Sequence, residues 1–275
     1  MNQNITKNNH ENYVEGNKLA WEDSFAHSTS GFGEDHAKIL KEETLPFLHP
    51  NFIQELRQYD LKDKKLLHLC CNNGRELASI VKGFEASSGV GIDIAENIVA
   101  QANKNAVEAG IPCEYFACNV LEIQEQYIGQ YDAVFFTIGA ICWFEDLTEL
   151  FQVASIYLKP GGYIFIYEAH PLQDIIPMPG DPSYDPENEL KIGWSYFKKE
   201  PFVDEMGMGY MGDQNRKSKT FTSFSHTMSD YINGLAKNGM CIQSCEEYDY
   251  DSACCYPHLS GMGFPLTLMM TAKKI

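Results

Sequence analysis

The chain has 275 residues, of which 44% are hydrophobic and 21% charged, with 21 glycines and 12 prolines. This composition is that of a globular protein and excludes the disordered, collagen-like and disulfide-stapled classes. Lys and Arg number 21 against 38 Asp and Glu, so the formal net charge is -17. Because such a field repels phosphate backbones, we expect no nucleic-acid partner.

The cysteines and the apolar runs predict the cellular compartment of the chain. The 9 cysteines are odd in number and show no C-x-x-C spacing, which favours a reducing cytoplasm over an oxidising compartment. No apolar run approaches the roughly 18 residues of a membrane span, and the amino-terminal residues lack the apolar stretch of a signal peptide. We therefore expect a cytoplasmic chain with no membrane partner.

Helical patterns open the chain. Residues 16–27 predict a short amphipathic helix with Leu19, Trp21 and Phe25 on its apolar face, and residues 35–47 predict a second helix. The asparagine-rich residues before the first helix are polar enough to be disordered by themselves.

Strands and helices then alternate. The first strand, KKLLHLCC, is a short apolar run without helical period, as expected for a strand buried on both faces of a parallel sheet. The pattern predicts strands at 64–71, 87–93, 112–118, 131–139 and 163–169, and helices at 75–84, 95–110 and 143–158. This order predicts an α/β protein with a doubly wound sheet and right-handed crossovers.

The order changes after the fifth strand. Residues 171–225 are rich in proline and glycine and contain two strand-like runs, 191–199 and 217–225, which we interpret as an insertion in the same domain. A helix over 227–240 follows and ends at Asn238-Gly239.

The last two predicted strands lie at 241–250 and 265–274. The loop between them is too short for a crossover helix, so we expect the two strands to pair antiparallel.

The loop after the first strand and the end of the second strand suggest a nucleoside ligand. Ligands of open α/β sheets bind beyond the carboxyl ends of the strands. The loop Cys70–Gly74 lies at this edge, and Asp93 ends the second strand 19 residues after Gly74, where a carboxylate can accept hydrogen bonds from a ribose diol. The loop has only one glycine of the G-x-G-x-x-G pattern that brings backbone against a pyrophosphate, which disfavours a dinucleotide.

Five segments resemble, in order, the conserved segments of class I S-adenosylmethionine-dependent methyltransferases. They are LLHLCCNNG, GVGIDIAENIVAQA, ACNVLEI, YDAVFFTIGAICWF and LKPGGYIFIYEAHP. The resemblance covers residues 60–170, and 227–275 more loosely. Within this class, the chain most resembles a bacterial type that acts on small molecules and whose substrate is unassigned. The resemblance implies S-adenosylmethionine as the cofactor and a Rossmann-like seven-stranded sheet whose last strand is antiparallel and is inserted beside the preceding one.

The resemblance also implies cofactor contacts. The backbone around His68, Cys70 and Gly74 would face the methionine part, and Asp93 would bind the ribose. Asn119 would stand where the family usually has an aspartate that accepts from the adenine amino group. The full set that the resemblance places around the cofactor is Trp21, His68, Cys70, Gly74, Asp93, Ile94, Asn119, Val120, Thr137, Ile138 and Gly139.

Methyl transfer from a sulfonium is an in-line displacement, so the protein mainly aligns the reactants and excludes water. A base helps only if the acceptor must lose a proton, and the candidates are Glu168, His170 and His226. Each of these histidines could equally be a structural hydrogen-bonding group. We expect Trp143, His27 and Tyr196 at the substrate. We expect no catalytic metal, because the fourth strand is followed by TIGAICWF, which has no metal-binding carboxylate.

Two regions are expected to cover the site. Residues 1–58 form an amino-terminal helical segment or lid, and residues 59–275 form the methyltransferase domain with the substrate-cap insertion 171–225. The expected function is methyl transfer to a small organic acceptor. A protein that binds S-adenosylmethionine or S-adenosylhomocysteine without turnover is the alternative, and a nicotinamide-dependent oxidoreductase is disfavoured. The sequence leaves open whether the chain forms a homo-oligomer.

Overall fold

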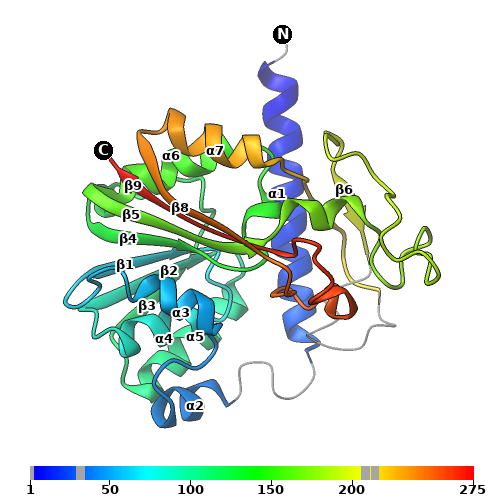
Figure 1. Cartoon of the computed structure of the whole chain (residues 1–275). Coiled ribbons are helices and arrows are strands. Elements are labelled where there is room, and N and C mark those ends of the chain that lie inside the picture. Colours follow the sequence, from blue (N-terminus) through cyan, green and yellow to red (C-terminus); the bar gives the residue numbers. More distant parts are fainter. Residues whose placement is uncertain (1–2, 29–34, 206–210, 212–216) are drawn as a thin grey trace.

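The computed structural model describes residues 3–28, 35–205, 211 and 217–275, with side chains from Tyr13 onward. Its centre is a seven-stranded sheet in the order β3-β2-β1-β4-β5-β9-β8 (Figure 1). The strands are β1 (Lys65–Leu69), β2 (Ser88–Asp93), β3 (Cys113–Ala117), β4 (Tyr131–Phe136), β5 (Leu158–Ala169), β8 (Met240–Tyr248) and β9 (Thr267–Lys274).

The strand order confirms the predicted Rossmann-like fold. The first five strands pair in parallel, for example Leu66 with Ala133, whereas β9 pairs antiparallel with both β5 and β8. The last strand in the chain therefore lies between β5 and β8, as the resemblance implied. The connection from β3 to β4 has no α-helix and contains only the short 3-10 turn η1 (Glu125–Tyr127).

Helices cover both faces of the sheet (Figure 1). One core packs side chains of α6 (Leu147–Tyr157) and α7 (Met228–Lys237) against the sheet. The other core uses side chains from α2 (His36–Glu42), α3 (Pro50–Leu56), α4 (Arg75–Gly83) and α5 (Glu96–Ala109). The central strands β1 and β4 are apolar on both faces because both faces of the sheet are covered there.

The amino-terminal helix is longer than predicted. Helix α1 spans Gln3–Ala26, so the asparagine-rich start continues the predicted helix toward the amino terminus. Its carboxyl-terminal half packs against the rest of the chain: the Asn17 carboxamide donates to the Thr222 carbonyl oxygen (2.8 Å) and accepts from the Thr222 N–H (2.7 Å). The predicted second helix is shorter and ends at Glu42.

The insertion contains one small hairpin. Strands β6 (Phe202–Asp204) and β7 (Phe221–Ser223) pair antiparallel. The predicted strand at 191–199 is wrong: these residues form turns and loops, and β6 begins only after Pro201. The predicted run at 217–225 does contain β7.

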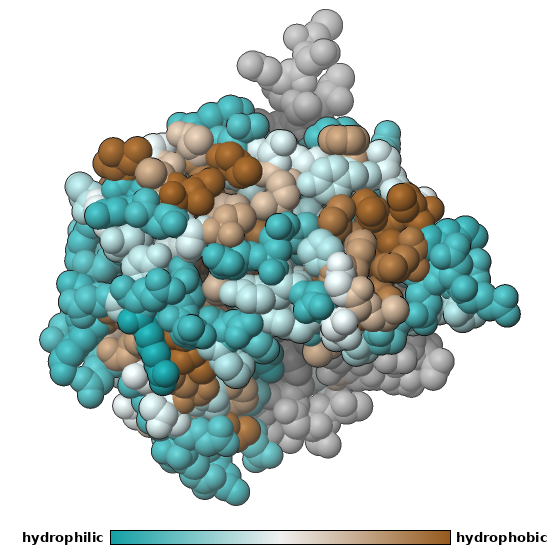
Figure 2. Space-filling view, in the orientation of Figure 1, coloured by the Kyte–Doolittle hydropathy of each residue, from teal (hydrophilic) through white to brown (hydrophobic). Residues whose placement is uncertain are grey.

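Exposed apolar side chains gather on the side of the molecule that carries the insertion (Figure 2). Ile192, Phe197 and Val203 are each more than half exposed, at 69%, 72% and 62%. Among the described helices, none combines the length and the apolar character that crossing a lipid bilayer requires.

Candidate active site

The loop after β1 turns through residues in the left-handed conformation. Cys70, Asn72 and Gly74 have φ angles of 59°, 48° and 74°. Only glycine fits at position 74, because a Cβ there would lie 2.4 Å from the Tyr115 ring, whose hydroxyl donates a 2.8 Å hydrogen bond to the Gly74 carbonyl oxygen. A single glycine is therefore enough to keep this loop tight against β3.

Asp93 ends β2 beside this loop. Its carboxylate accepts hydrogen bonds from the backbone N–H of Asn72 (2.8 Å) and of Ala95 (3.2 Å). Burial raises the pKa of Asp93, and these N–H groups oppose that shift. Each carboxylate oxygen has a further lone pair, and the side chain keeps some accessible surface. The residue thus fits a ligand that offers two hydroxyl donors.

Two buried side chains near the loop have nitrogen atoms without a hydrogen-bond partner. They are Nδ2 of Asn73, a residue 2% exposed, and Nδ1 of His68, which is 0% exposed. The other ring nitrogen of His68 lies 3.0 Å from Thr137 Oγ1, and burial lowers the pKa of this histidine to about 4. An unpartnered buried amide is costly without a ligand. Sequence reasoning included His68 and Thr137 but missed Asn73, because an asparagine in a loop carries no motif.

The positions predicted for adenine follow β2 and β3. Ile94 is half-buried directly after Asp93, and Val120 is buried in the core that packs under α6. The Asn119 side-chain oxygen accepts a 3.1 Å hydrogen bond from the Leu121 N–H. This is a local turn contact that uses one of the two lone pairs of the oxygen, so a contact with adenine stays a prediction.

Glu168 lies at the centre of the loop after β4. Its carboxylate accepts from the backbone N–H groups of Ala140 (2.9 Å), Ile141 (3.0 Å) and Ala169 (2.8 Å), and also from that of Gly139. The assignment of Glu168 as a free general base is therefore not supported. Its oxygens hold the turn in which Gly139 has a φ of 80°. Ile138, in the same turn, is 37% exposed to solvent.

The environments of His170 and His27 also differ from those expected. His170 is buried, with Nε2 2.7 Å from a Glu247 carboxylate oxygen, and its Nδ1 accepts from the Leu172 N–H at 3.1 Å. Both ring nitrogens are thus engaged and cannot readily accept a proton from a ligand. His27 is exposed at the end of α1, and its Nδ1 lies 2.8 Å from the Asp23 carbonyl oxygen. Neither arrangement supports a role at the substrate.

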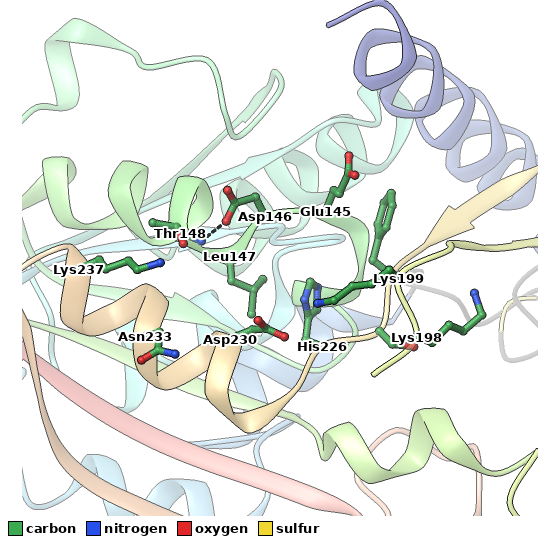
Figure 3. Close-up of a pocket in the computed structure, with 12 residues that line it drawn as sticks. Glu145, Asp146, Leu147, Thr148, Lys198, Lys199, His226, Asp230, Asn233 and Lys237 are labelled. Atoms are coloured by element: carbon green, nitrogen blue, oxygen red, sulfur yellow. Dashed lines mark hydrogen bonds between the residues drawn. The ribbon is translucent and has the colours of Figure 1, made fainter. Parts of the chain in front are cut away.

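His226 has a different environment. The residue is 6% exposed, its Nε2 has no hydrogen-bond partner, and burial lowers its pKa to about 4. It lines a pocket of about 260 Å³ between the starts of α6 and α7 and the insertion. In Figure 3 the Lys199 side chain extends toward the His226 ring, and Asp230 reaches the same region from α7. The neutral His226 ring can accept a hydrogen bond but is a weak base.

Aromatic rings join the amino-terminal helix to the insertion. Trp21 of α1 contacts Trp143 and Phe221, with ring centroids 5.6 Å apart in both pairs, and Trp143 and Phe221 are also 5.6 Å apart. Trp21 was predicted at the cofactor and Trp143 at the substrate, and the structure brings the two together. Tyr196 is engaged elsewhere, because its hydroxyl accepts from the Met228 N–H at the start of α7 (2.7 Å).

Asp174 is a further ionisable group at this edge that sequence reasoning missed. It lies in the 3-10 turn η3 (Pro171–Ile175), directly after β5. Burial and the nearby Glu168 carboxylate raise its pKa to about 7. The only signal in the sequence is its place six residues after Glu168, in a proline-rich segment without a motif.

Comparisons with known proteins show which families this chain is similar to. Residues 66–162 match the family model described as a methyltransferase domain. The ubiquinone biosynthesis O-methyltransferase of Bordetella avium is 29% identical over 118 residues, which is 43% of this chain and 47% of the relative. The enzyme of the same name from Pseudomonas aeruginosa (strain LESB58) is 26% identical over 149 residues, covering 48% and 62%. The chain thus spans about half the length of the curated relatives it matches.

Solved structures agree on the fold. An S-adenosylmethionine-dependent methyltransferase from Mesorhizobium loti has a TM-score of 0.56 at 20% identity, covering 80% of this chain and 96% of the other. The geranyl diphosphate C-methyltransferase from Streptomyces coelicolor has a TM-score of 0.58 at 14% identity, covering 96% and 98%. Residues 66–162 are thus similar to a methyltransferase domain, and the strand order and these likenesses show that the chain has the fold of S-adenosylmethionine-dependent methyltransferases.

Proposed function

We propose that the chain transfers a methyl group from S-adenosylmethionine to a small organic acceptor. The observation that carries this proposal is the position of Asp93, whose carboxylate lies against the tight loop after β1 with lone pairs left for a ribose diol. The absence of further glycines in the loop 70–74 argues against a pyrophosphate in this place.

The residues around the site bind, orient and exclude water. When bound, the cofactor supplies a methyl group on a positively charged sulfur. Asp93 holds the ribose, and the Cys70–Gly74 backbone shapes the end that carries the methionine part. Glu168 fixes the loop after β4, whose residues Thr137–Gly139 would line the reacting methyl group. Transfer then needs an acceptor aligned in line with the carbon–sulfur bond and shielded from water.

The acceptor side is aromatic. Trp21, Trp143 and Phe221 form a cluster between α1 and the insertion, and Tyr13 contacts Phe224 with ring centroids 5.0 Å apart. Apolar and aromatic walls with few polar groups are typical of small-molecule sites. The curated relatives are O-methyltransferases of ubiquinone biosynthesis. Both observations support an acceptor of modest size with an aromatic or similarly apolar body.

We also propose that α1 and the insertion 171–225 act as a lid over the domain 59–275. Helix α1 contacts the cofactor side as well as the insertion: the Glu96 N–H donates to a Glu22 carboxylate oxygen (3.2 Å), and the Asn97 side chain donates to the Glu22 carbonyl oxygen (2.8 Å). These contacts lie just after Asp93. One helix therefore connects the proposed ribose site with the proposed acceptor cap.

A methyl-transfer assay distinguishes an enzyme from a protein that only binds the cofactor. The purified chain is incubated with S-adenosylmethionine labelled in its methyl group and with bacterial metabolite extracts, and the label is followed into extract components. We expect transfer that is lost in the Asp93→Ala variant. Binding of S-adenosylhomocysteine without transfer into any extract would favour the non-catalytic alternative instead.

A further inference from the structure

A pocket of about 260 Å³ lies between the starts of α6 and α7 and the insertion, and the proposed function does not use it (Figure 3). The volume suits a small molecule, because pockets for drug-sized ligands begin at about 300 Å³. The described residues that line it are 145–148, 198–199 and 224–226, with Asp230, Asn233 and Lys237 of α7. None of these belongs to the loops after β1, β2 or β3, so the pocket is separate from the proposed ribose site at Asp93.

The buried end of the pocket carries a polar atom without a partner. His226 lines the pocket and is 6% exposed, and its Nε2 forms no hydrogen bond with any described residue. Burial lowers the pKa of His226 to about 4, so the ring is neutral at neutral pH. Buried polar atoms are nearly always paired with protein, water or ligand. An unpaired ring nitrogen at the side of a pocket therefore points to a ligand atom that can form a hydrogen bond.

The lysine beside this ring indicates which group the ligand carries there. In Figure 3 the Lys199 side chain extends toward the His226 ring. Within the described part of the chain, the Lys199 ammonium has no ion pair or hydrogen bond. A ligand ammonium would be repelled by Lys199, and an apolar group would leave both polar groups unpaired. A hydroxyl group can accept from the ammonium and can donate to Nε2 or accept from it, whichever tautomer is present. The buried end therefore favours a hydroxyl.

The other end of the pocket is open and offers hydrogen-bond donors. Lys237 and Asn233 are exposed and lie at this end in Figure 3. Neither side chain has a hydrogen bond or an ion pair with another described residue. Lys198 differs, because its ammonium donates to the Pro201 carbonyl oxygen (3.0 Å) and lies 4.4 Å from the centroid of the Phe202 ring. A free ammonium and a free amide at the open end fit a carboxylate on the ligand.

The acidic side chains of the pocket favour a ligand with a single negative charge. Asp146 accepts from the Thr148 N–H (2.7 Å) at the start of α6, and Asp230 accepts from the Thr227 N–H and hydroxyl (both 2.8 Å) at the start of α7. These two carboxylates therefore complement the helix amino termini. Together with Glu145 they line the pocket and would repel a phosphate dianion more strongly than a carboxylate.

We propose that this pocket binds a small hydroxy acid. The hydroxyl group of the ligand lies between His226 and Lys199, where it completes the hydrogen bonds of the buried ring nitrogen. The carboxylate lies at the open end, beside Lys237 and Asn233. The proposed function uses none of these four side chains, so this site and the proposed methyl transfer can be tested separately.

The test titrates δ-hydroxyvalerate, valerate and δ-aminovalerate into the full chain without cofactor at neutral pH. NMR follows the ring nitrogen signals of His226, assigned in the labelled wild-type chain. We expect δ-hydroxyvalerate to shift these signals and to bind about 3- to 10-fold more tightly than valerate, as for one additional hydrogen bond. The double variant Lys199→Gln/Lys237→Gln should bind δ-hydroxyvalerate about 3-fold or more weakly. The control Lys38→Gln/Lys104→Gln removes two exposed lysines of α2 and α5, and should bind as wild type.

Each other result contradicts the proposal. If no probe shifts the His226 signals, water completes the hydrogen bonds of the ring and the pocket does not bind this class of ligand. If valerate binds as tightly as δ-hydroxyvalerate, the hydroxyl group is not recognised. If δ-aminovalerate or inorganic phosphate binds most tightly, the pocket takes a different class of ligand. Binding of S-adenosylhomocysteine is measured separately and tests the proposed function alone.

Discussion

Glu168 shows how a buried charge can organise a loop. Its carboxylate accepts from the backbone N–H groups of Gly139, Ala140 and Ile141 after β4 and of Ala169 at the end of β5. Burial raises the pKa of this carboxyl, and the N–H groups oppose the shift because they stabilise the ionised form. The residue thus acts on the site through the backbone of residues 139–141.

We expect Glu168→Ala to lower the free energy of unfolding by about 2 to 4 kcal/mol, because it leaves several buried N–H groups unpaired. Urea denaturation measures the change. Glu187→Ala, at an exposed position of the insertion, is the control and should change stability by less than about 0.5 kcal/mol. A Glu168→Ala variant of wild-type stability would show that these hydrogen bonds are not needed.

The raised pKa of Asp174 predicts how the free energy of unfolding depends on pH. Its pKa in the folded chain is about 7 against an ordinary value of 3.8, so the folded state binds a proton that the unfolded state has already released. The wild-type chain therefore loses stability as the pH rises from about 4 to 7. Asp174→Asn does not titrate, so its stability relative to wild type should increase over this range and level off above it.

Denaturation of both proteins at about pH 5 and pH 8 measures this difference, which we expect to be on the order of 1 to 3 kcal/mol. A difference that stays constant with pH would mean that Asp174 titrates near its ordinary value.

At the residue scale, positions that follow from a strand end could be predicted from the sequence, whereas hydrogen bonds that depend on packing could not. Asp93 and Gly74 lie at the carboxyl edge of the sheet because strand ends fix their position, and their contacts with a cofactor stay predictions. The hydrogen bonds that engage Glu168 and His170 could not be predicted, since a sequence does not show which backbone N–H groups will reach a side chain. Asp174 could not be found, because its neighbours come from segments far apart in the chain.

At the scale of elements, helix α1 is the part that the sequence described least well. Its apolar positions suggested a helix over residues 16–27, yet the helix begins at Gln3. Polar residues next to a docked helix can extend it without leaving an amphipathic pattern. The docking itself depends on Asn17, Trp21 and Glu22, whose partners lie in the insertion and at the start of α5.

The two hydrogen bonds of Asn17 with Thr222 should therefore couple α1 to the insertion. We expect S-adenosylhomocysteine to slow hydrogen exchange in residues 13–28 and 217–225, while the sheet core changes little. Asn17→Ala should weaken that protection and lower stability by about 1 to 2 kcal/mol. Asn188→Ala, at an exposed position of the insertion, is the matched control. We expect the slowing to extend over residues 10–30 and 190–225, of which 29–30, 206–210 and 212–216 lie outside the described residues.

Equal exchange with and without S-adenosylhomocysteine in both segments would contradict the lid. The aromatic rings Trp21, Trp143 and Phe221 would then be only a small core that holds α1 in place.

At the scale of the whole molecule, the sheet could be predicted because the alternation of apolar runs and helices allows few strand orders. The strand order and the antiparallel β9 follow from short connections and right-handed crossovers. In residues 171–225 the strand predicted at 191–199 was placed too early, since short strands at the surface are selected by side-chain packing more than by local preference.

The loop after β1 also predicts which class of cofactor the whole chain binds. A loop with one glycine cannot present a ring of free N–H groups to a pyrophosphate, so we expect NAD to bind no more tightly than millimolar. Calorimetry with NAD and with S-adenosylhomocysteine compares the two directly. Micromolar NAD binding would contradict the choice of cofactor.

The central claim is that Asp93 binds the cofactor ribose. Calorimetric titration of S-adenosylhomocysteine into the wild-type chain and into Asp93→Ala tests it. Asp132→Ala, near the start of β4, removes the ion pair with Lys159 and the hydrogen bond from the Lys65 N–H, and serves as the control. We predict that Asp93→Ala loses about 2 to 3 kcal/mol of binding free energy, or roughly 30- to 150-fold in Kd, and that Asp132→Ala binds as wild type. Equal affinity of the wild-type and Asp93→Ala chains would contradict the account.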